Sequence, residues 1–373
     1  MQILQLSTSL PKNGYSTEEL MEIFPCKLPE SVKENIHNLG VKKRYLINNE
    51  ASFSKLETIL SEAGLVELCV EACEKAVEKA CLSVRDVGYF VAAYDVNPFL
   101  CPGLSQLLVR KVGFNPYIKH FNAQGIASTA FPKALELAEN YLAAHPKDYV
   151  LLCISGVSSY WFQNQVGGLK DVMEISQINQ IKKETKRQME LRKWVATMEF
   201  FLFGDGVAAA IVAKEGLGLS VERIVEVTNV GKKDFLAGYT RLSALNEPFK
   251  FGFHSHLGRE IPELGTKYTA LALENLLGKN AENTIKAAKK WVVHTGSEKI
   301  LDRIAKHHRI SYEKIRESHE VLKEYGNLAG ASLPFILEKI VSEDKLSKGD
   351  IVLMVGYGLG FSASAALLKH NKN

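Results

Sequence analysis

The chain has 373 residues, of which 46% are hydrophobic, and its formal net charge is +4. A chain of this size can fold as one large domain or two ordinary ones around a sizeable core. The balanced charge gives no indication of nucleic-acid binding, and no apolar run is long enough to predict a membrane span.

The N-terminus has neither the basic start nor the long apolar segment of a secretory signal. The six cysteines include no Cys-x-x-Cys pair, so neither a zinc site nor a disulfide framework is indicated. Cys69 and Cys73 lie one helical turn apart, and we interpret them as apolar helix positions. We therefore expect a reduced, cytoplasmic protein.

Strands and helices are expected to alternate in the first half of the chain. Short apolar runs predict strands, and apolar residues that recur with the helical period predict helices. The expected helices cover residues 64–83, 104–112 and 129–143, and the expected strands cover 87–94, 117–123, 150–156 and 207–213.

The second half repeats this pattern, and its strands are again apolar on both faces. Such strands are typical of an α/β protein whose sheet is covered on both sides. Helices are expected at residues 267–278, 282–290, 297–307, 311–319 and 331–341, and strands at 291–296 and 351–360. The KEGLG segment places a boundary between the halves near residue 215.

Residues 169–194 are rich in charged residues and good helix formers. We interpret this segment as a solvated surface helix. An insertion that docks a partner or covers the active site is the alternative.

Two glycine motifs follow or precede apolar runs. GYGLG at 356–360 is no dinucleotide fingerprint, because only 13 residues follow Gly360 and a further strand–helix unit does not fit. Its glycines are expected to let the backbone approach a ligand or a neighbouring loop. FGDG at 203–206 is interpreted as a turn, in which Asp205 alone is weak evidence for a site.

Three polar residues stand at turns beside apolar strands. Ser128 begins a helix, where the helix dipole and free N–H groups favour a developing anion. His294 follows the strand WVV, and Asn327 lies in a glycine-rich turn before a helix. A nucleophile, a proton-accepting histidine and an orienting amide form a general nucleophilic site. Helix caps and satisfied polar groups are the structural alternative.

Motifs along the whole chain resemble the thiolase-fold condensing enzymes. This group comprises ketoacyl synthase III, the type III polyketide synthases and the fatty-acid-elongating ketoacyl-CoA synthases. The similar segments are VKKRY at 41–45, CPGLSQLLVRKVGFNPYIKHFNAQG at 101–125, LFGDGVAAAIV at 202–212, WVVHTGSEKIL at 291–301, YGNLAGASLPFIL at 325–337 and GYGLG at 356–360.

The resemblance implies a five-layered αβαβα sandwich of two similar halves. Residues 1–215, with 169–194 as a helical insertion, would carry the nucleophile, and residues 216–373 would carry His294 and Asn327 as the catalytic histidine and asparagine. The resemblance also implies a homodimer that uses acyl-CoA or acyl carrier protein as substrate. It implies no metal and no redox cofactor.

The resemblance further assigns substrate-binding positions of three kinds. Two are aromatic gate positions of the type III enzymes, two are glycines of a loop that would help bind the acyl oxygen, and three form a basic motif near the coenzyme A entrance. They are Phe203 and Phe253, Gly358 and Gly360, and Lys42, Lys43 and Arg44. Core phenylalanines and solvated surface lysines are the alternatives.

The resembling enzymes carry a cysteine where this chain has Ser128. Counting forward from Gly113 and back from the end of the following helix both give Ser128, whereas Ile126 would need gaps on both sides. A serine hydroxyl does not ionise near neutral pH as an activated thiol does, so His294 must act as a general base. An oxygen ester is also less readily attacked by a carbanion, so carbon–carbon condensation should suffer most.

Three functions remain open. The first is an acyltransferase that takes an acyl group from a coenzyme A or carrier-protein thioester onto Ser128. The second is a decarboxylative Claisen-condensing ketosynthase whose native cysteine is replaced by serine as an engineered trap, with His294 and Asn327 stabilising the enolate. The third is a non-catalytic partner subunit of a condensing heterodimer.

Overall fold

The computed structural model describes the chain except residues 48–63, 96–100, 243–252, 344 and 373. A large sheet runs through the described part. Its strands are β1 (Gln2–Ser9), β4 (Val87–Tyr94), β5 (Lys119–Gln124), β6 (Tyr149–Ser155), β7 (Val207–Ala213), β8 (Leu219–Thr228), β11 (Lys290–Val293), β12 (Ile351–Gly358) and β13 (Ser362–His370). Their order is β11-β12-β13-β8-β1-β7-β6-β4-β5.

This sheet consists of two half-sheets that barely meet. β1 and β8 pair only through Gln2 with Ser220 and Ile3 with Leu219. In the first half-sheet, β7 is antiparallel to β1 and β6, and β4 is parallel to β6 and β5. In the second, β13 is antiparallel to β8 and β12, and β11 is parallel to β12. The two halves therefore share one topology, and within the described residues the second lacks only a counterpart of β5.

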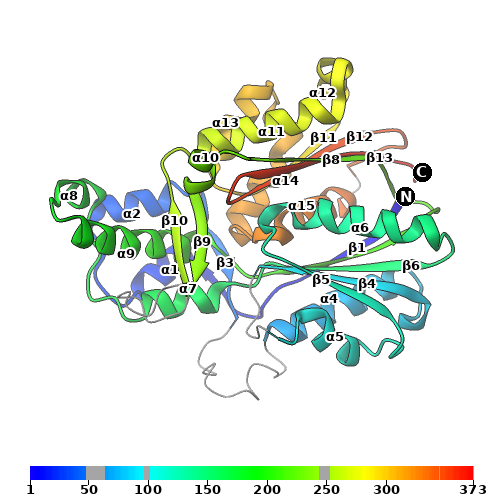
Figure 1. Ribbon diagram of the computed structural model, residues 1–373, viewed down its shortest axis with the longest axis horizontal. Coiled ribbons are helices and arrows are strands. Elements are labelled where there is room, and N and C mark those ends of the chain that lie inside the picture. The colour runs from blue at the N-terminus through cyan, green and yellow to red at the C-terminus, as the bar shows by residue number, and fades with distance from the viewer. Residues whose placement is uncertain (48–63, 96–100, 243–252, 344, 373) are drawn as a thin grey trace.

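Helices form three layers around the half-sheets (Figure 1). The middle layer holds α6 (Ala130–Ala144) and α15 (Ser332–Ser342), whose apolar residues join both half-sheets in one core. Apolar clusters also attach α4 (Leu65–Lys79) and α5 (Leu104–Val112) to the first half-sheet, and α11 (Ile261–Leu277), α13 (Glu298–His308) and α14 (Tyr312–Tyr325) to the second. This is the expected five-layered αβαβα sandwich.

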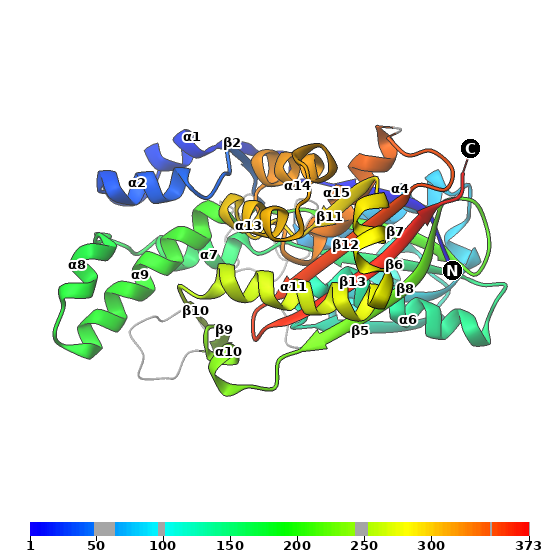
Figure 2. The same cartoon turned by 90° about the horizontal axis from the view of Figure 1, so that it is seen from above.

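A smaller unit lies beside one end of the sandwich (Figures 1 and 2). Its apolar cluster includes Leu20, Phe24, Phe162 and Phe201. Its elements are β2 (Gly14–Ser16), α1 (Thr17–Glu22), α2 (Glu30–His37), β3 (Lys43–Tyr45), α7 (Ser159–Val166), α8 (Ile175–Gln180) and α9 (Glu184–Leu202).

The remaining elements are short. The strands β9 (Gly238–Leu242) and β10 (Phe253–Leu257) pair with each other, and β10 packs on α9. The others are α10 (Lys232–Leu236), α12 (Ala281–Ala287) and the 3₁₀ turns η1 (Val84–Asp86), η2 (Ala127–Thr129), η3 (Gly278–Asn280) and η4 (Ala329–Ala331).

The helical interpretation of residues 169–194 is confirmed, because α8 and much of α9 lie there. The segment is not solvated throughout, since Ile178 and Glu190 are buried. Cys69 and Cys73 are buried positions of α4, as expected. None of the helices in the described part of the chain is long and apolar enough to cross a membrane.

Candidate active site

Ser128 lies in the turn that joins β5 to the central helix α6. The turn includes Ala127, whose φ of 45° is uncommon for a residue with a Cβ atom. The 3₁₀ turn η2 follows, and α6 begins at Ala130. The turn leaves Ser128 only 4% exposed, near the N-terminal end of a helix, where the dipole favours a developing anion.

The structure brings Ser128 and His294 into hydrogen-bond contact. Ser128 Oγ lies 2.9 Å from His294 Nε2, although 166 residues separate the two in sequence. His294 directly follows β11, and its backbone N–H donates to the Val355 carbonyl of the neighbouring strand β12. The end of the second half-sheet therefore holds the histidine against the turn of the first half-sheet.

Burial lowers the pKa of His294 to about 3, so its imidazole is neutral near pH 7. Its Nδ1 atom has no hydrogen-bond partner among the described residues. The ring packs edge-on against Tyr357, with ring centroids 5.1 Å apart. A neutral ring accepts the Ser128 proton at Nε2 when its hydrogen is on Nδ1.

Asn327 lies in the turn before α15, next to the turn of Ser128. Its side-chain Oδ1 accepts the N–H of Ala329 at 2.8 Å, and its backbone N–H donates to Leu202. The described contacts include no hydrogen bond between Asn327 and His294. The structure thus places Asn327 in the site region, since η2 and η4 are in contact, but not as the group that orients the imidazole.

The end of β12 packs directly on the turn of Ser128, and its glycines make this possible. A Cβ atom on Gly356 would overlap the Ser128 carbonyl oxygen, and one on Gly358 would lie 2.8 Å from Ala127 Cβ. Gly360 has a φ of 75° and donates its N–H to Gly238. The Gly360 N–H is therefore not free to bind an acyl oxygen in this structure.

Of the two predicted gate residues, the structure describes the side-chain contacts of Phe203 only. Phe203 directly follows α9, forms an isolated backbone bridge with Asn327, and stacks its ring on Phe162 at 5.0 Å. This places Phe203 beside the turn of Asn327. Phe253 is the first residue of β10, but its side chain lies outside the described residues.

The basic motif does not act as one surface patch. Lys42 and Lys43 are exposed, whereas Arg44 is completely buried. The Arg44 guanidinium donates to Thr17 Oγ1 at 2.9 Å and lies over the ring of Phe201. Burial lowers the pKa of Arg44 to about 9. The structure therefore does not place Arg44 at the surface, where we expected it to meet coenzyme A phosphates.

Asp205, which the sequence left as weak evidence, joins three segments of the chain. Its carboxylate accepts the N–H groups of Ile47, Ser158 and Ser159 at 2.9 Å each, and also the Ser159 hydroxyl. These bonds explain the aspartate within FGDG, because it ties the segment before β7 to the smaller unit.

Asp95 was missed by sequence reasoning. It follows β4, and its Oδ1 accepts the N–H of Ala127 at 2.8 Å, one residue from Ser128. Its place at the carboxyl end of a buried parallel strand could have identified it, since such ends form sites. No group of three or more potential metal-ligating side chains occurs within the described ranges.

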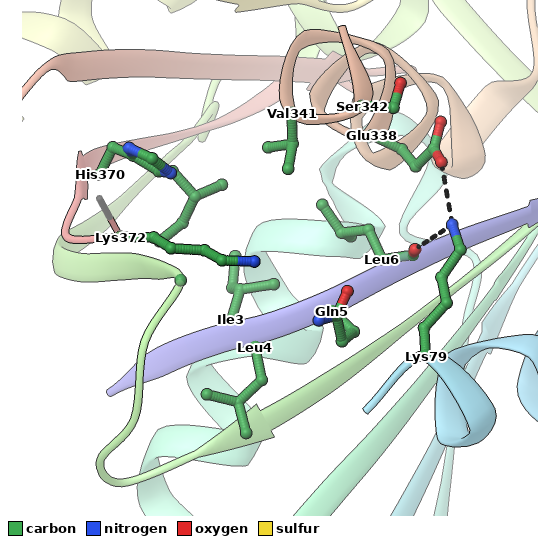
Figure 3. A pocket seen from close by; sticks show the side chains of 12 residues that line it. Ile3, Leu4, Gln5, Leu6, Lys79, Glu338, Val341, Ser342, His370 and Lys372 are labelled. Carbon is green, nitrogen blue, oxygen red and sulfur yellow. Dashed lines mark hydrogen bonds and ion pairs between the residues drawn. The ribbon is translucent and has the colours of Figure 1, made fainter. Parts of the chain in front are cut away.

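A cavity of about 320 Å³ lies away from these residues, between β1, the C-terminal end of α15 and the start of β8 (Figure 3). It is lined partly by Ile3, Leu6, Val341 and His370. Lys79 crosses its edge and donates to the Leu6 carbonyl at 3.0 Å. None of the expected site residues lines this cavity.

Residues 279–370 match the family described as 3-oxoacyl-[acyl-carrier-protein (ACP)] synthase III C terminal. This segment contains both His294 and Asn327. The match covers the second half-sheet from β11 to β13, and thus the half that supplies the proposed base.

Relatives and solved structures extend the likeness to the whole chain. The chain is 22% identical to a 3,5-dihydroxyphenylacetyl-CoA synthase of Amycolatopsis orientalis, over 98% of this chain and 92% of the relative. It is 26% identical to a beta-ketoacyl-[acyl-carrier-protein] synthase III of Clostridium perfringens, over 96% of each. The crystal structure of 1,3,6,8-tetrahydroxynaphthalene synthase from Streptomyces coelicolor A3(2), a bacterial type III polyketide synthase, matches with a TM-score of 0.76 and 20% identity over 100% of both chains.

The chain therefore has the thiolase-like fold and resembles the ketoacyl synthase III and type III polyketide synthase enzymes along its whole length. The resemblance expected from the sequence motifs is confirmed. The related proteins are synthases, which supports an enzyme that transfers groups.

Proposed function

We propose that this protein is an acyltransferase in which Ser128 accepts an acyl group from a coenzyme A or carrier-protein thioester. The observation that carries the proposal is the 2.9 Å contact between Ser128 Oγ and His294 Nε2 in a buried site. The relatives named for a coenzyme A thioester and for an acyl carrier protein supply the class of donor.

In the first step, Ser128 Oγ attacks the thioester carbonyl while its proton passes to His294 Nε2. This attack forms the C–O bond. Collapse of the tetrahedral intermediate then restores the carbonyl and breaks the C–S bond, and the imidazolium returns the proton to the leaving sulfur. Because burial strongly disfavours the imidazolium, it is stable only beside the negative oxyanion. The two charges therefore form and disappear together.

In the second step, the hydroxyl, thiol or amine of an acceptor attacks the Ser128 ester. Its proton passes to His294 Nε2 and then to Ser128 Oγ, which restores the free enzyme. The acceptor must reach the same buried pair, so Phe203, beside Asn327, is proposed to border its path. Lys42 and Lys43 are proposed to bind the coenzyme A phosphates at the exposed β3 segment.

One observation favours the condensing ketosynthase with serine in place of cysteine. A neutral, deeply buried His294 suits hydrogen bonding to an enolate better than it suits holding a proton. The same tight Ser128–His294 pair argues against a silent partner subunit, which has no need of it.

We also propose a homodimer and a division into halves at residues 1–215 and 216–373. β5 forms one end of the described sheet, and its Phe121 is 46% exposed. An uncovered edge strand with apolar side chains pairs readily with a second copy. Light scattering should give twice the chain mass, and Phe121→Lys should lower it to a monomer.

The test is acylation of the intact protein by a panel of acyl-coenzyme A thioesters, with the adduct located by peptide mass. An adduct on the Ser128 peptide, lost in Ser128→Ala and slowed in His294→Ala, is the expected result. If no donor acylates the wild type but Ser128→Cys is acylated readily, the condensing alternative is favoured. If both stay unmodified, the partner-subunit interpretation replaces the proposal.

A further inference from the structure

Two alanines in this protein share an unusual backbone conformation. Ala127 has a φ of 45° and Ala329 a φ of 46°, and each begins a 3₁₀ turn that leads into a central helix. A side chain with a Cβ atom is disfavoured in this region, so the conformation persists only where the surroundings hold it.

Both strained turns are held in the same way, by a side-chain oxygen that accepts the alanine N–H. Asn327 Oδ1 accepts from Ala329 at 2.8 Å, and Asp95 Oδ1 accepts from Ala127 at 2.8 Å. Asn327 belongs to the turn that it holds. Asp95 comes from the end of β4, 32 residues before the turn, so its contact is tertiary.

The location of Asp95 ties it to the reacting serine. β4 pairs with β5 in parallel register, with Tyr94 opposite Gln124, so the strand ends lie side by side. Asp95 follows one strand, and the Ser128 turn follows the other. Burial raises the pKa of Asp95 to about 6, which makes a carboxyl costly at this place unless its hydrogen bond has a use.

We propose that Asp95 is a positioning residue of the Ser128 site. By holding the Ala127 N–H, it keeps the turn in the conformation that aims Ser128 Oγ at His294 Nε2. Asp95 acts through the backbone and need not touch the substrate. The inference rests on Ser128 being the acylated residue, which is the proposed function.

The hydrogen bond and the charge of Asp95 can be separated by two substitutions. Asp95→Asn keeps an oxygen that accepts the Ala127 N–H, whereas Asp95→Ala removes it. Misplacing a reacting atom by about 1 Å lowers a rate up to about a hundred-fold, so Asp95→Ala should slow Ser128 acylation by about ten- to a hundred-fold. Asp95→Asn should stay within about three-fold of wild type on the same argument.

Adding Ala127→Gly to Asp95→Ala provides a rescue test. Glycine adopts positive φ without a Cβ penalty, so the turn no longer needs the Asp95 contact. The double variant should regain most of the lost rate per folded molecule. Asp302→Asn, which neutralises a side chain that is 68% exposed, is the matched control for charge.

A second readout does not depend on acyl transfer. In a Ser128→Cys background, alkylation of the new thiol by iodoacetamide, followed by peptide mass against pH, reports its contact with His294. Asp95→Ala should shift the profile to higher pH, whereas Asp95→Asn should not. This readout distinguishes failure of the acyltransferase proposal from failure of the positioning role.

The positioning role is supported by three results together. Asp95→Ala slows acylation and shifts the alkylation profile to higher pH, Asp95→Asn changes neither, and Ala127→Gly restores both in the Asp95→Ala background. It is overturned if Asp95→Ala matches wild type, if Asp95→Asn is as impaired as Asp95→Ala, or if Ala127→Gly gives no recovery. If no donor acylates the wild type, the thiol profile alone decides between these outcomes.

Discussion

The Ser128 turn and the turn after Asn327 have the same backbone but carry different side chains. Each begins at an alanine with positive φ and leads into a helix of the middle layer. Where the first turn has Ser128, the second has Gly330, and a Cβ atom there would lie 2.8 Å from Ala130 Cβ. The repeated topology thus provides two similar turns. One carries Ser128, the proposed nucleophile, and the other carries a glycine, which lets the second turn pack closely on Ala130.

The two turns also differ in how they are stabilised. The alanine N–H of the second turn donates to Asn327 of the same turn, whereas that of the first donates to Asp95 at the end of a neighbouring strand. The turn that carries Ser128, the proposed nucleophile, is therefore the one whose alanine N–H is bonded through a tertiary contact.

The largest expected effect on stability comes from replacing the glycines that pack against each turn. A Cβ on Gly356 would overlap the Ser128 carbonyl, and one on Gly156 would overlap the Leu328 carbonyl. Each change to alanine should lower the free energy of unfolding by about 3 kcal/mol, because rigid backbone lies on both sides. Urea denaturation measures this, with Gly168→Ala as control because nothing lies within 4 Å of its Cβ position.

Removing the acceptor from the second turn should have the next largest effect. Asn327→Ala leaves the Ala329 N–H without its partner and should cost about 1–3 kcal/mol of stability. Asn327→Asp keeps the acceptor and should retain most of this stability. Thermal unfolding of the two variants measures the difference. Equal losses of stability in both would show that the hydrogen bond does not hold the turn.

The pH dependence of stability should distinguish the carboxyl of the first turn from the amide of the second. Burial raises the pKa of Asp95 to about 6, compared with about 3.9 in the unfolded chain. Between these two pH values, the folded state therefore binds the carboxyl proton of Asp95 more tightly than the unfolded chain does. The contribution of Asp95 to the free energy of unfolding is therefore fully present below about pH 4. It is lost as the pH rises towards 6, by at most about 1.4 kcal/mol per pH unit.

Asp95→Asn should remove this slope, and Asn327→Asp should introduce a new one at the other turn. Denaturant midpoints of the three proteins between pH 4 and pH 7, compared pairwise, isolate these two groups from the other titrating residues. A slope that is unchanged in Asp95→Asn would contradict the assignment.

The smallest expected effect concerns the strained alanines themselves. Ala127→Gly and Ala329→Gly relieve the positive-φ strain but add unfolded-state entropy, so each should stabilise the protein by at most about 1 kcal/mol. The two changes should agree closely if the turns are equivalent. Ala143→Gly, at an exposed position of α6, should instead destabilise by about 0.5–1 kcal/mol.

The local pattern of apolar residues in the sequence was enough to predict several strands and helices. Residues 87–94, 104–112 and 207–213 match β4, α5 and β7 from end to end. These segments carry strong apolar periodicity or continuous β-branched and small apolar runs, which act over neighbouring residues. β1 and β8 were not predicted, because their exposed and buried positions do not alternate regularly.

The sequence by itself determined the α/β class, the likeness to condensing enzymes, and Ser128, His294 and Asn327 as site candidates, because these follow from local runs and motifs. Tertiary structure alone decided that Ser128 meets His294, that Arg44 is buried, and that Asp95 accepts a hydrogen bond from the turn of Ser128. Each of these depends on which strand lies beside which. That pairing arises from burying two half-sheets on one layer of helices, and no single stretch of the chain encodes it.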